Sequence, residues 1–134
     1  METREVLIDT NLFIEHIRSR DKASTFLARI QELRYHLATS SIVVAELCYG
    51  ARSALARTAV EKVLFGVEVL PFTAEMAFQV SVEAERLRNQ NTLVGFRDLA
   101  IACVALRTGL PVATHNRAEF ARVPGLEIFE LEAK

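Results

Sequence analysis

Three acidic residues of this chain interrupt apolar stretches, at positions where an unpaired charge would be costly. Asp9 follows the short run EVLI, Glu46 is the only charge in SIVVAELCYGA, and Asp98 interrupts FRDLAIACVAL. A buried carboxylate needs a partner, and crowded carboxylates repel one another. No cationic partner is evident from the pattern, whereas Mg²⁺ or Mn²⁺ prefers such oxygen ligands. We therefore predict that the three acids converge as metal ligands of a site for phosphoryl transfer or hydrolysis.

Each of these acids also has an ordinary structural explanation. Asp9 is placed to cap the helix that follows it. Asp98 lies in the first turn of another predicted helix, where the helix dipole favours an anion. Glu46, in the middle of an apolar helix, is harder to explain without a partner. One shared site accounts for all three acids, so we adopt it as the hypothesis.

Short apolar runs alternate with amphipathic stretches along the chain, which is typical of an α/β domain with a mostly parallel sheet. Strands are predicted at 5–8, 35–39, 67–72, 111–115 and 126–131. Helices are predicted at 10–20, 22–36, 40–55, 57–66, 73–90, 96–109 and 117–123. Ligands of such sheets bind outside the carboxyl ends of the strands. Asp9 lies at that edge, and Thr114, Asn116 and Glu119 follow the predicted fourth strand toward the same edge.

Length and composition indicate one globular domain, residues 1–134, with a formal net charge of −1. This charge provides no general attraction for nucleic acid or for an anionic membrane. The N-terminus has no apolar signal stretch, and no run is long enough to span a bilayer. Cys48 and Cys103 lie in apolar helical patterns without a partner at metal-ligand spacing. We expect both to be reduced thiols in the core of a cytoplasmic protein.

Three other classes with polar groups at a sheet edge are disfavoured by single positions. A response-regulator receiver needs an adjacent acidic pair after the first strand and a suitably placed late lysine, and this chain has neither. A haloacid-type phosphatase needs a second aspartate two residues after the first, where this chain has Asn11. A dinucleotide-binding domain needs a glycine-rich turn after the first strand, and DTNLF contains no glycine.

Three blocks of the sequence together resemble the PIN-domain nucleases. They are LIDTN, SSIVVAELCYGA and VGFRDLAIACVALRTGLPVATHNRAEFARVPGLEIFEL, and their order and spacing are similar to those of VapC-type toxins of toxin–antitoxin pairs. The resemblance covers essentially the whole chain. It implies a PIN-like three-layer fold, with a parallel sheet of about five short strands and helices on both faces. It also implies a metal-dependent ribonuclease, a homodimer, and a small DNA-binding antitoxin of the VapB type as partner.

The resemblance also assigns residues. Asp9, Glu46 and Asp98 match the three acidic metal ligands, and Asn116 matches a fourth site position that is aspartate in many PIN domains. This departure leaves open whether a second metal binds, and Glu119 is the residue that would supply the missing charge. The supporting polar positions are matched by Thr10, Asn11 and Thr114.

We therefore predict a Mg²⁺- or Mn²⁺-dependent endoribonuclease of the toxin type, with Arg97 and Arg117 as candidate RNA contacts. The alternatives are a catalytically silent PIN scaffold that acts only as a binding partner, and a housekeeping PIN nuclease of RNA processing. An acidic site would also attract a basic residue of the antitoxin. Because the carboxylates are expected to repel one another without metal, replacing Asp9 or Asp98 by Asn should not weaken folding.

Overall fold

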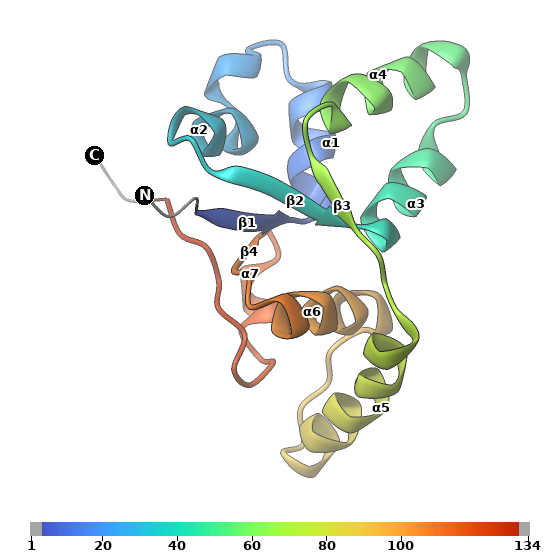
Figure 1. The fold of residues 1–134 in the computed structure, drawn as a ribbon, viewed down its shortest axis with the longest axis vertical. Helices are drawn as coiled ribbons and strands as arrows, with labels where there is room; N and C mark the ends of the chain where they lie inside the picture. The colour runs from blue at the N-terminus through green and yellow to red at the C-terminus, as the bar shows by residue number, and fades with distance from the viewer. Residues whose placement is uncertain (1–3, 132–134) are drawn as a thin grey trace.

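A parallel sheet of four short strands forms the centre of the protein in the computed structural model, which describes residues 4–131. The strand order is β3-β2-β1-β4, and all three neighbouring pairs are parallel (Figure 1). The strands are β1 (Glu5–Ile8), β2 (His36–Ser40), β3 (Glu68–Leu70) and β4 (Val112–Ala113). The predicted α/β class with a parallel sheet is confirmed.

The predicted fifth strand, at 126–131, is not a strand within the described residues. Only one parallel bridge joins this segment to the sheet, between Val112 and Ile128. The backbone N–H of Val112 donates to Glu127 at 2.9 Å, and the N–H of Phe129 donates to Val112 at 2.8 Å. Since β4 is two residues long, it provides too little edge for a longer ladder. The prediction of about five strands is therefore corrected to four.

Helices cover both faces of the sheet, as predicted for a three-layer fold (Figure 1). One layer packs α1 against α2, α3 and α4, and the other packs α6 against α5 and α7. No helix within residues 4–131 is long and apolar enough to cross a bilayer. The helices are α1 (Thr10–Arg18), α2 (Phe26–Glu32), α3 (Ser41–Gly50), α4 (Ala54–Leu64), α5 (Ala74–Asn89), α6 (Phe96–Thr108) and α7 (Arg117–Phe120), with a short 3₁₀ helix at Lys22–Ser24.

The core lies around β1 and α6. Val6, Leu7 and Ile8 of β1 are fully buried, because helices cover both faces of a parallel strand. On α6, every residue from Asp98 to Ala105 is buried, and Gly109 ends the helix in the left-handed conformation that glycine favours. Each fully buried Leu or Ile contributes roughly 1.5–3 kcal/mol through the hydrophobic effect. The two elements that carry Asp9 and Asp98 are therefore firmly anchored.

The two cysteines differ in their surroundings. Cys103 is buried in α6, and burial raises the pKa of its thiol to about 11. Cys48, on α3, is exposed. The expectation of a core thiol is therefore correct for Cys103 and wrong for Cys48, because α3 packs on its neighbours through only part of its surface, with Val43 and Leu47 as its buried residues.

Candidate active site

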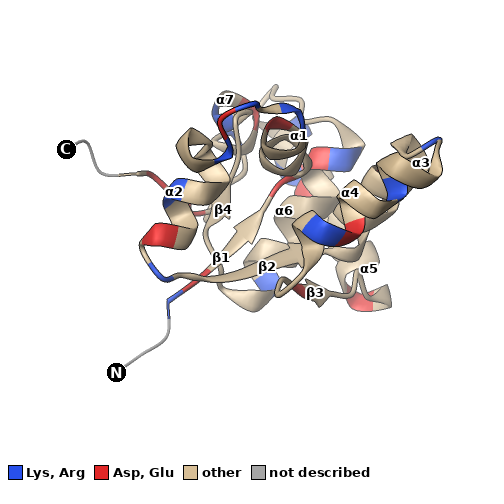
Figure 2. Ribbon diagram, turned by 90° about the horizontal axis from the view of Figure 1, so that it is seen from above, with Lys and Arg blue, Asp and Glu red and all other residues tan. Residues whose placement is uncertain are grey.

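The candidate site lies where the chain changes direction in the sheet. From β1 the chain adds β2 and then β3 on one side, and it later places β4 on the other side of β1. In sheets with this kind of strand order the connections that leave the two strands diverge, and ligands usually bind in the crevice between them, outside the carboxyl ends of the strands. Asp9 follows β1, and Thr114 follows β4. Figure 2 shows an acidic segment, in red, where β1 passes into α1.

Asp9 is the most enclosed of the three acids. It has no exposed surface, and its backbone N–H donates to Ala113 of β4 at 3.0 Å. As the N-cap of α1, its Oδ1 accepts the N–H of Thr10 at 2.8 Å. Its Oδ2 accepts the hydroxyl of Thr114 at 2.7 Å. The capping role considered from the sequence is therefore present, together with contacts that capping alone does not require.

Asp98 comes from the first turn of α6, on the opposite side of the crevice. Its Oδ2 accepts the side-chain amide of Asn116 at 2.8 Å, so the carboxylate points toward the end of β4. Burial raises the pKa of Asp98, although the neighbouring Arg97 guanidinium acts in the opposite direction. The charges of Asp9 and Glu119 contribute further to this rise. A cation that binds here therefore competes with a proton at a higher pH than at an ordinary aspartate.

Glu46 reaches the site from the middle of α3. Its side chain is half-buried, and its Oε1 accepts the hydroxyl of Thr10 at 2.8 Å. Thr10 thereby links Glu46 to the first turn of α1, directly beside Asp9. This contact explains how a lone glutamate is accommodated in an otherwise apolar helix.

The side chain of Arg97 lies between the three carboxylates. Its Nε donates to Glu46 Oε2 at 2.6 Å, its Nη2 donates to Asp9 Oδ1 at 2.6 Å, and its Nη1 donates to Asp98 Oδ1. Nη2 also donates to the hydroxyl of Thr10 at 2.6 Å. Burial by itself would lower the pKa of Arg97, but its hydrogen bonds and attraction to Glu46 and Asp9 raise this pKa above its ordinary value.

One expectation is corrected by this arrangement, because the carboxylates do have a cationic partner. Arg97 lies inside the acidic cluster, and its contact with RNA stays a prediction. The sequence places Arg97 directly beside Asp98, but it does not show where so long a side chain turns, so the contacts of Arg97 with all three acids were not predicted. The signal was the pair RD at the start of α6, where a long side chain can fold back toward the acids.

A chain of polar side chains supports the cluster. The backbone N–H of Asn116 donates to the Thr114 hydroxyl at 2.9 Å, and Nδ2 of Asn11 donates to the same oxygen at 3.4 Å. Asn11 Oδ1 in turn accepts the N–H of His115 at 3.2 Å. The polar positions Thr10, Asn11, Thr114 and Asn116 are thus all brought to the cluster or directly behind it.

Glu119 and Arg117 are not brought into the cluster. Glu119 accepts the backbone N–H of Gly95 at 3.1 Å and pairs with Arg122 at 3.2 Å. It therefore holds the start of α6, the helix that carries Asp98. Arg117 forms an exposed ion pair with Glu130.

The donor set of the cluster fits a hard divalent cation. Three carboxylates and an amide converge at a buried edge, and a cationic group already occupies their centre. A different trio, Glu5, His36 and Glu68 at the amino ends of their strands, has ligand atoms within 4.8 Å of one another. It is the one group of His, Cys, Asp or Glu within residues 4–131 that is this close. The oxygens of Asp9, Glu46 and Asp98 are therefore spread more widely.

Known proteins share both the sequence and the fold. The PIN domain family model matches residues 6–126. The chain belongs to the PIN domain family. A relative named tRNA(fMet)-specific endonuclease VapC, from Salmonella typhimurium, is 34% identical to this PIN domain over 91% of the chain and 94% of that protein. Ribonuclease VapC2 of Haemophilus influenzae is 31% identical over 90% of the chain and 92% of that protein.

Solved structures give the same result for this PIN domain. VapBC2 from Rickettsia felis, bound to a DNA fragment from its promoter, matches with a TM-score of 0.82 and 25% identity. That match covers 96% of this chain and 99% of the other. DNA-bound VapBC from Salmonella typhimurium matches with a TM-score of 0.76 and 30% identity, over 96% of this chain and 98% of the other. The PIN-like fold expected from the resemblance is confirmed.

The position of Arg97 reverses the expectation for metal-free stability. Asp9 is fully buried and accepts hydrogen bonds from Arg97 and Thr114, so Asp9→Asn should lower the free energy of unfolding by about 1–3 kcal/mol. Glu46→Gln is the matched control and should lose less than about 1 kcal/mol, because its side chain is more exposed to water. Urea denaturation in the presence of a chelator measures both values. An unchanged or increased stability of Asp9→Asn would mean that repulsion between the carboxylates dominates.

Proposed function

We propose that this PIN domain is a metal-dependent endoribonuclease, the toxin component of a type II toxin–antitoxin system, that hydrolyses RNA phosphodiester bonds. The observation that carries the proposal is the convergence of Asp9, Glu46 and Asp98 on one cation at the crevice of the sheet. Relatives that match over nine-tenths of the chain are named as ribonucleases or as a tRNA-specific endonuclease. The similar solved structures are VapBC complexes, two of them bound to DNA. The partner is accordingly a VapB-like, DNA-binding antitoxin, and the site of action is the cytoplasm.

Asp9, Glu46 and Asp98 would hold one Mg²⁺ or Mn²⁺ ion. Carboxylate oxygens are the ligands that these ions prefer, and Mg²⁺ usually retains several waters when proteins bind it. When bound, such an ion lowers the pKa of a coordinated water and stabilises charge on a phosphate oxygen.

The chain's own residues orient this machinery. Thr114 donates to one oxygen of Asp9 and Asn116 donates to one oxygen of Asp98, so a polar neighbour orients each of these carboxylates. Such supporting hydrogen bonds are typically worth 10–100-fold in metal affinity or activity. Glu119 acts through Gly95, because it holds the first turn of α6 in place. We propose this supporting role for Glu119 in place of a direct bond to a second metal.

The activity test compares two aspartates of the same chain. Asp98→Asn should reduce the rate of RNA cleavage at limiting Mg²⁺ by at least about 100-fold, since the substitution removes a ligand charge. Asp21→Asn is the matched control and should cleave like the wild type, because Asp21 precedes a surface 3₁₀ helix and makes no side-chain capping bond. Cleavage of total RNA, followed by mapping of the new ends, measures the rate and also identifies the target.

The two alternatives give different results in the same assay. A catalytically silent scaffold would give no metal-dependent cleavage with the wild type either. A housekeeping nuclease would cleave RNA, but its expression alone would leave growth unaffected and no small neighbouring gene product would bind it. Cleavage together with growth arrest that the antitoxin relieves is the outcome expected here.

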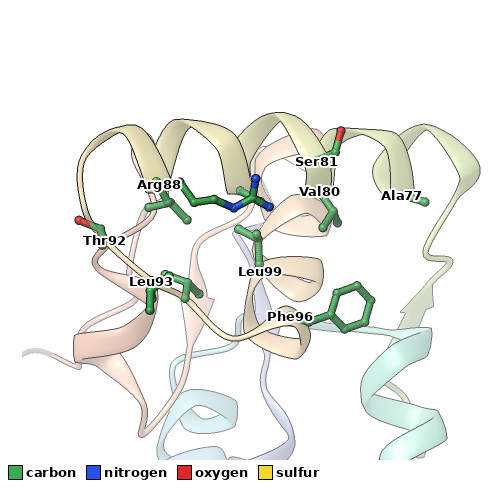
Figure 3. A pocket seen from close by; sticks show the side chains of 11 residues that line it. Ala77, Val80, Ser81, Arg88, Thr92, Leu93, Phe96 and Leu99 are labelled. Carbon is green, nitrogen blue, oxygen red and sulfur yellow. The ribbon is translucent and has the colours of Figure 1, made fainter.

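We further propose that the protein is a homodimer. Phe78 and Val82 on α5 are exposed, as are Leu93 in the loop before α6 and Phe96, the first residue of α6. Leu93 and Phe96 line a groove of about 400 Å³ between α5 and α6, and in Figure 3 Val80 and Leu99 lie on opposite sides of it. An apolar surface of this kind is commonly covered by a partner.

A stable dimer should bury roughly 1,600 Å² or more in total. Light scattering at micromolar concentration should therefore give twice the 15.0 kDa mass of the chain. Leu93→Glu should shift that mass toward the monomer, because it places a charge in the apolar groove that the partner would cover. Phe65→Glu, on the other exposed apolar stretch that follows α4, is the control that should stay dimeric. A wild-type mass near that of one chain would contradict the proposal.

A further inference from the structure

We propose that Arg97 is a displaceable internal cation, which occupies the metal position of the free protein and must withdraw before a divalent ion can bind. The inference rests on the proposed function, because it concerns the same three carboxylates. The free protein would then be held in a state that binds metal weakly.

Arg97 uses the carboxylate oxygens that a metal ion would need. Its guanidinium contacts one carboxylate oxygen each of Asp9, Glu46 and Asp98. The remaining oxygens of Asp9 and Asp98 accept hydrogen bonds from Thr114 and Asn116. The planar guanidinium fork suits several carboxylates at once. A second cation therefore cannot bind the same inner oxygens while Arg97 stays in place.

The three carboxylates are spaced more widely than the ligands of one Mg²⁺ ion. Ligands of Mg²⁺ lie at about 2.0–2.1 Å from the ion, so neighbouring oxygens of its shell are roughly 3 Å apart. The oxygens of the three acids do not all come within 4.8 Å of one another, since no such group is found among them in the described chain. A guanidinium with a hydrogen bond to each acid holds them at this wider spacing. Withdrawal of Arg97 is what allows them to close around a smaller ion.

The formal charge of the cluster favours a divalent ion over the guanidinium. Three carboxylates and one guanidinium leave the cluster with a formal charge of −2, if all are ionised. One divalent ion in place of the guanidinium would leave −1. A divalent ion is thus the better counter-charge, and the hydrogen bonds of Arg97 oppose its entry. The free protein and the loaded protein therefore differ in which cation the acids share.

The side chain of Arg97 can turn away from the acids toward solvent. Its side chain is 35% exposed, whereas that of Asp9 is fully buried. It lies in the first turn of α6, next to Phe96, which is 73% exposed. Rotation of the side chain toward solvent therefore leaves the core of α6 intact. A withdrawn guanidinium remains one residue from Asp98, where it can donate to phosphate oxygens, the chemistry for which arginine is best suited.

The test measures metal affinity rather than activity. The metal-free protein is titrated with Mn²⁺ by calorimetry for the wild type, Arg97→Ala and Arg97→Gln. If the Arg-free conformation is a minor state populated at roughly 0.1–10%, removing the competitor should tighten Mn²⁺ binding by about 10-fold to 1,000-fold. Arg107→Ala is the matched control, because Arg107 lies at the other end of α6 in an exposed ion pair with Glu75. It should bind Mn²⁺ like the wild type.

Thermal unfolding gives an independent readout. Without metal, Arg97→Ala should melt below the wild type, because three carboxylates lose their shared partner. Saturating Mn²⁺ should then raise the melting temperature of Arg97→Ala by more than it raises that of the wild type. If Arg97→Ala does not fold without metal, Arg97→Gln retains hydrogen-bonding capacity without the charge and is used for the same comparison.

The outcomes separate this inference from the proposed function. Equal or weaker Mn²⁺ binding by both Arg97 variants, with wild-type protein that cleaves RNA in a metal-dependent manner, overturns the role of Arg97 and leaves the nuclease assignment intact. Absence of both Mn²⁺ binding and RNA cleavage in every variant overturns the nuclease assignment and the role of Arg97 with it. Tighter binding by both variants, with Arg107→Ala unchanged, supports the displaceable cation.

Discussion

Three carboxylates that meet at one buried edge of a sheet need a shared cation, and the rest of this structure depends on that constraint. The crevice beside β1 and β4 brings Asp9 together with residues that follow β4. The start of α6 supplies Asp98, and the middle of α3 supplies Glu46. In the free protein the shared cation is the guanidinium of Arg97, supplied by the chain itself. The same three acids would serve a divalent ion once that group has moved and they have closed to a smaller spacing.

The positions of the acids were predictable from the sequence because backbone geometry determines them. A polar residue directly after a buried parallel strand must lie at the carboxyl edge of the sheet, which placed both Asp9 and Thr114. The position of Arg97 was not predictable in this way, because a long side chain can turn in many directions from the same backbone. Glu119 illustrates the same limit, since its carboxylate turns to Gly95 and Arg122. The prediction of a fifth strand at 126–131 was wrong for another reason, because β4 is too short to pair with a full strand.

The internal cation affects how a basic residue of the antitoxin could reach the three carboxylates. An acidic cluster alone would attract a basic residue of the antitoxin, as the sequence suggested. Here Arg97 already satisfies the carboxylates, so an antitoxin residue would have to displace it as a metal would. A metal, such an antitoxin residue and Arg97 would then compete for one set of oxygens. This competition would link metal loading to inhibition without any change in the fold of the domain.

The most direct test of this account is a crystal structure of the protein with Mn²⁺, in which anomalous scattering locates the ion. The account predicts one strong anomalous peak between Asp9, Glu46 and Asp98, with the Arg97 side chain withdrawn from all three. An ion bound instead at Glu5, His36 and Glu68, the closely spaced trio at the opposite end of the strands, with Arg97 still between the acids, would contradict it.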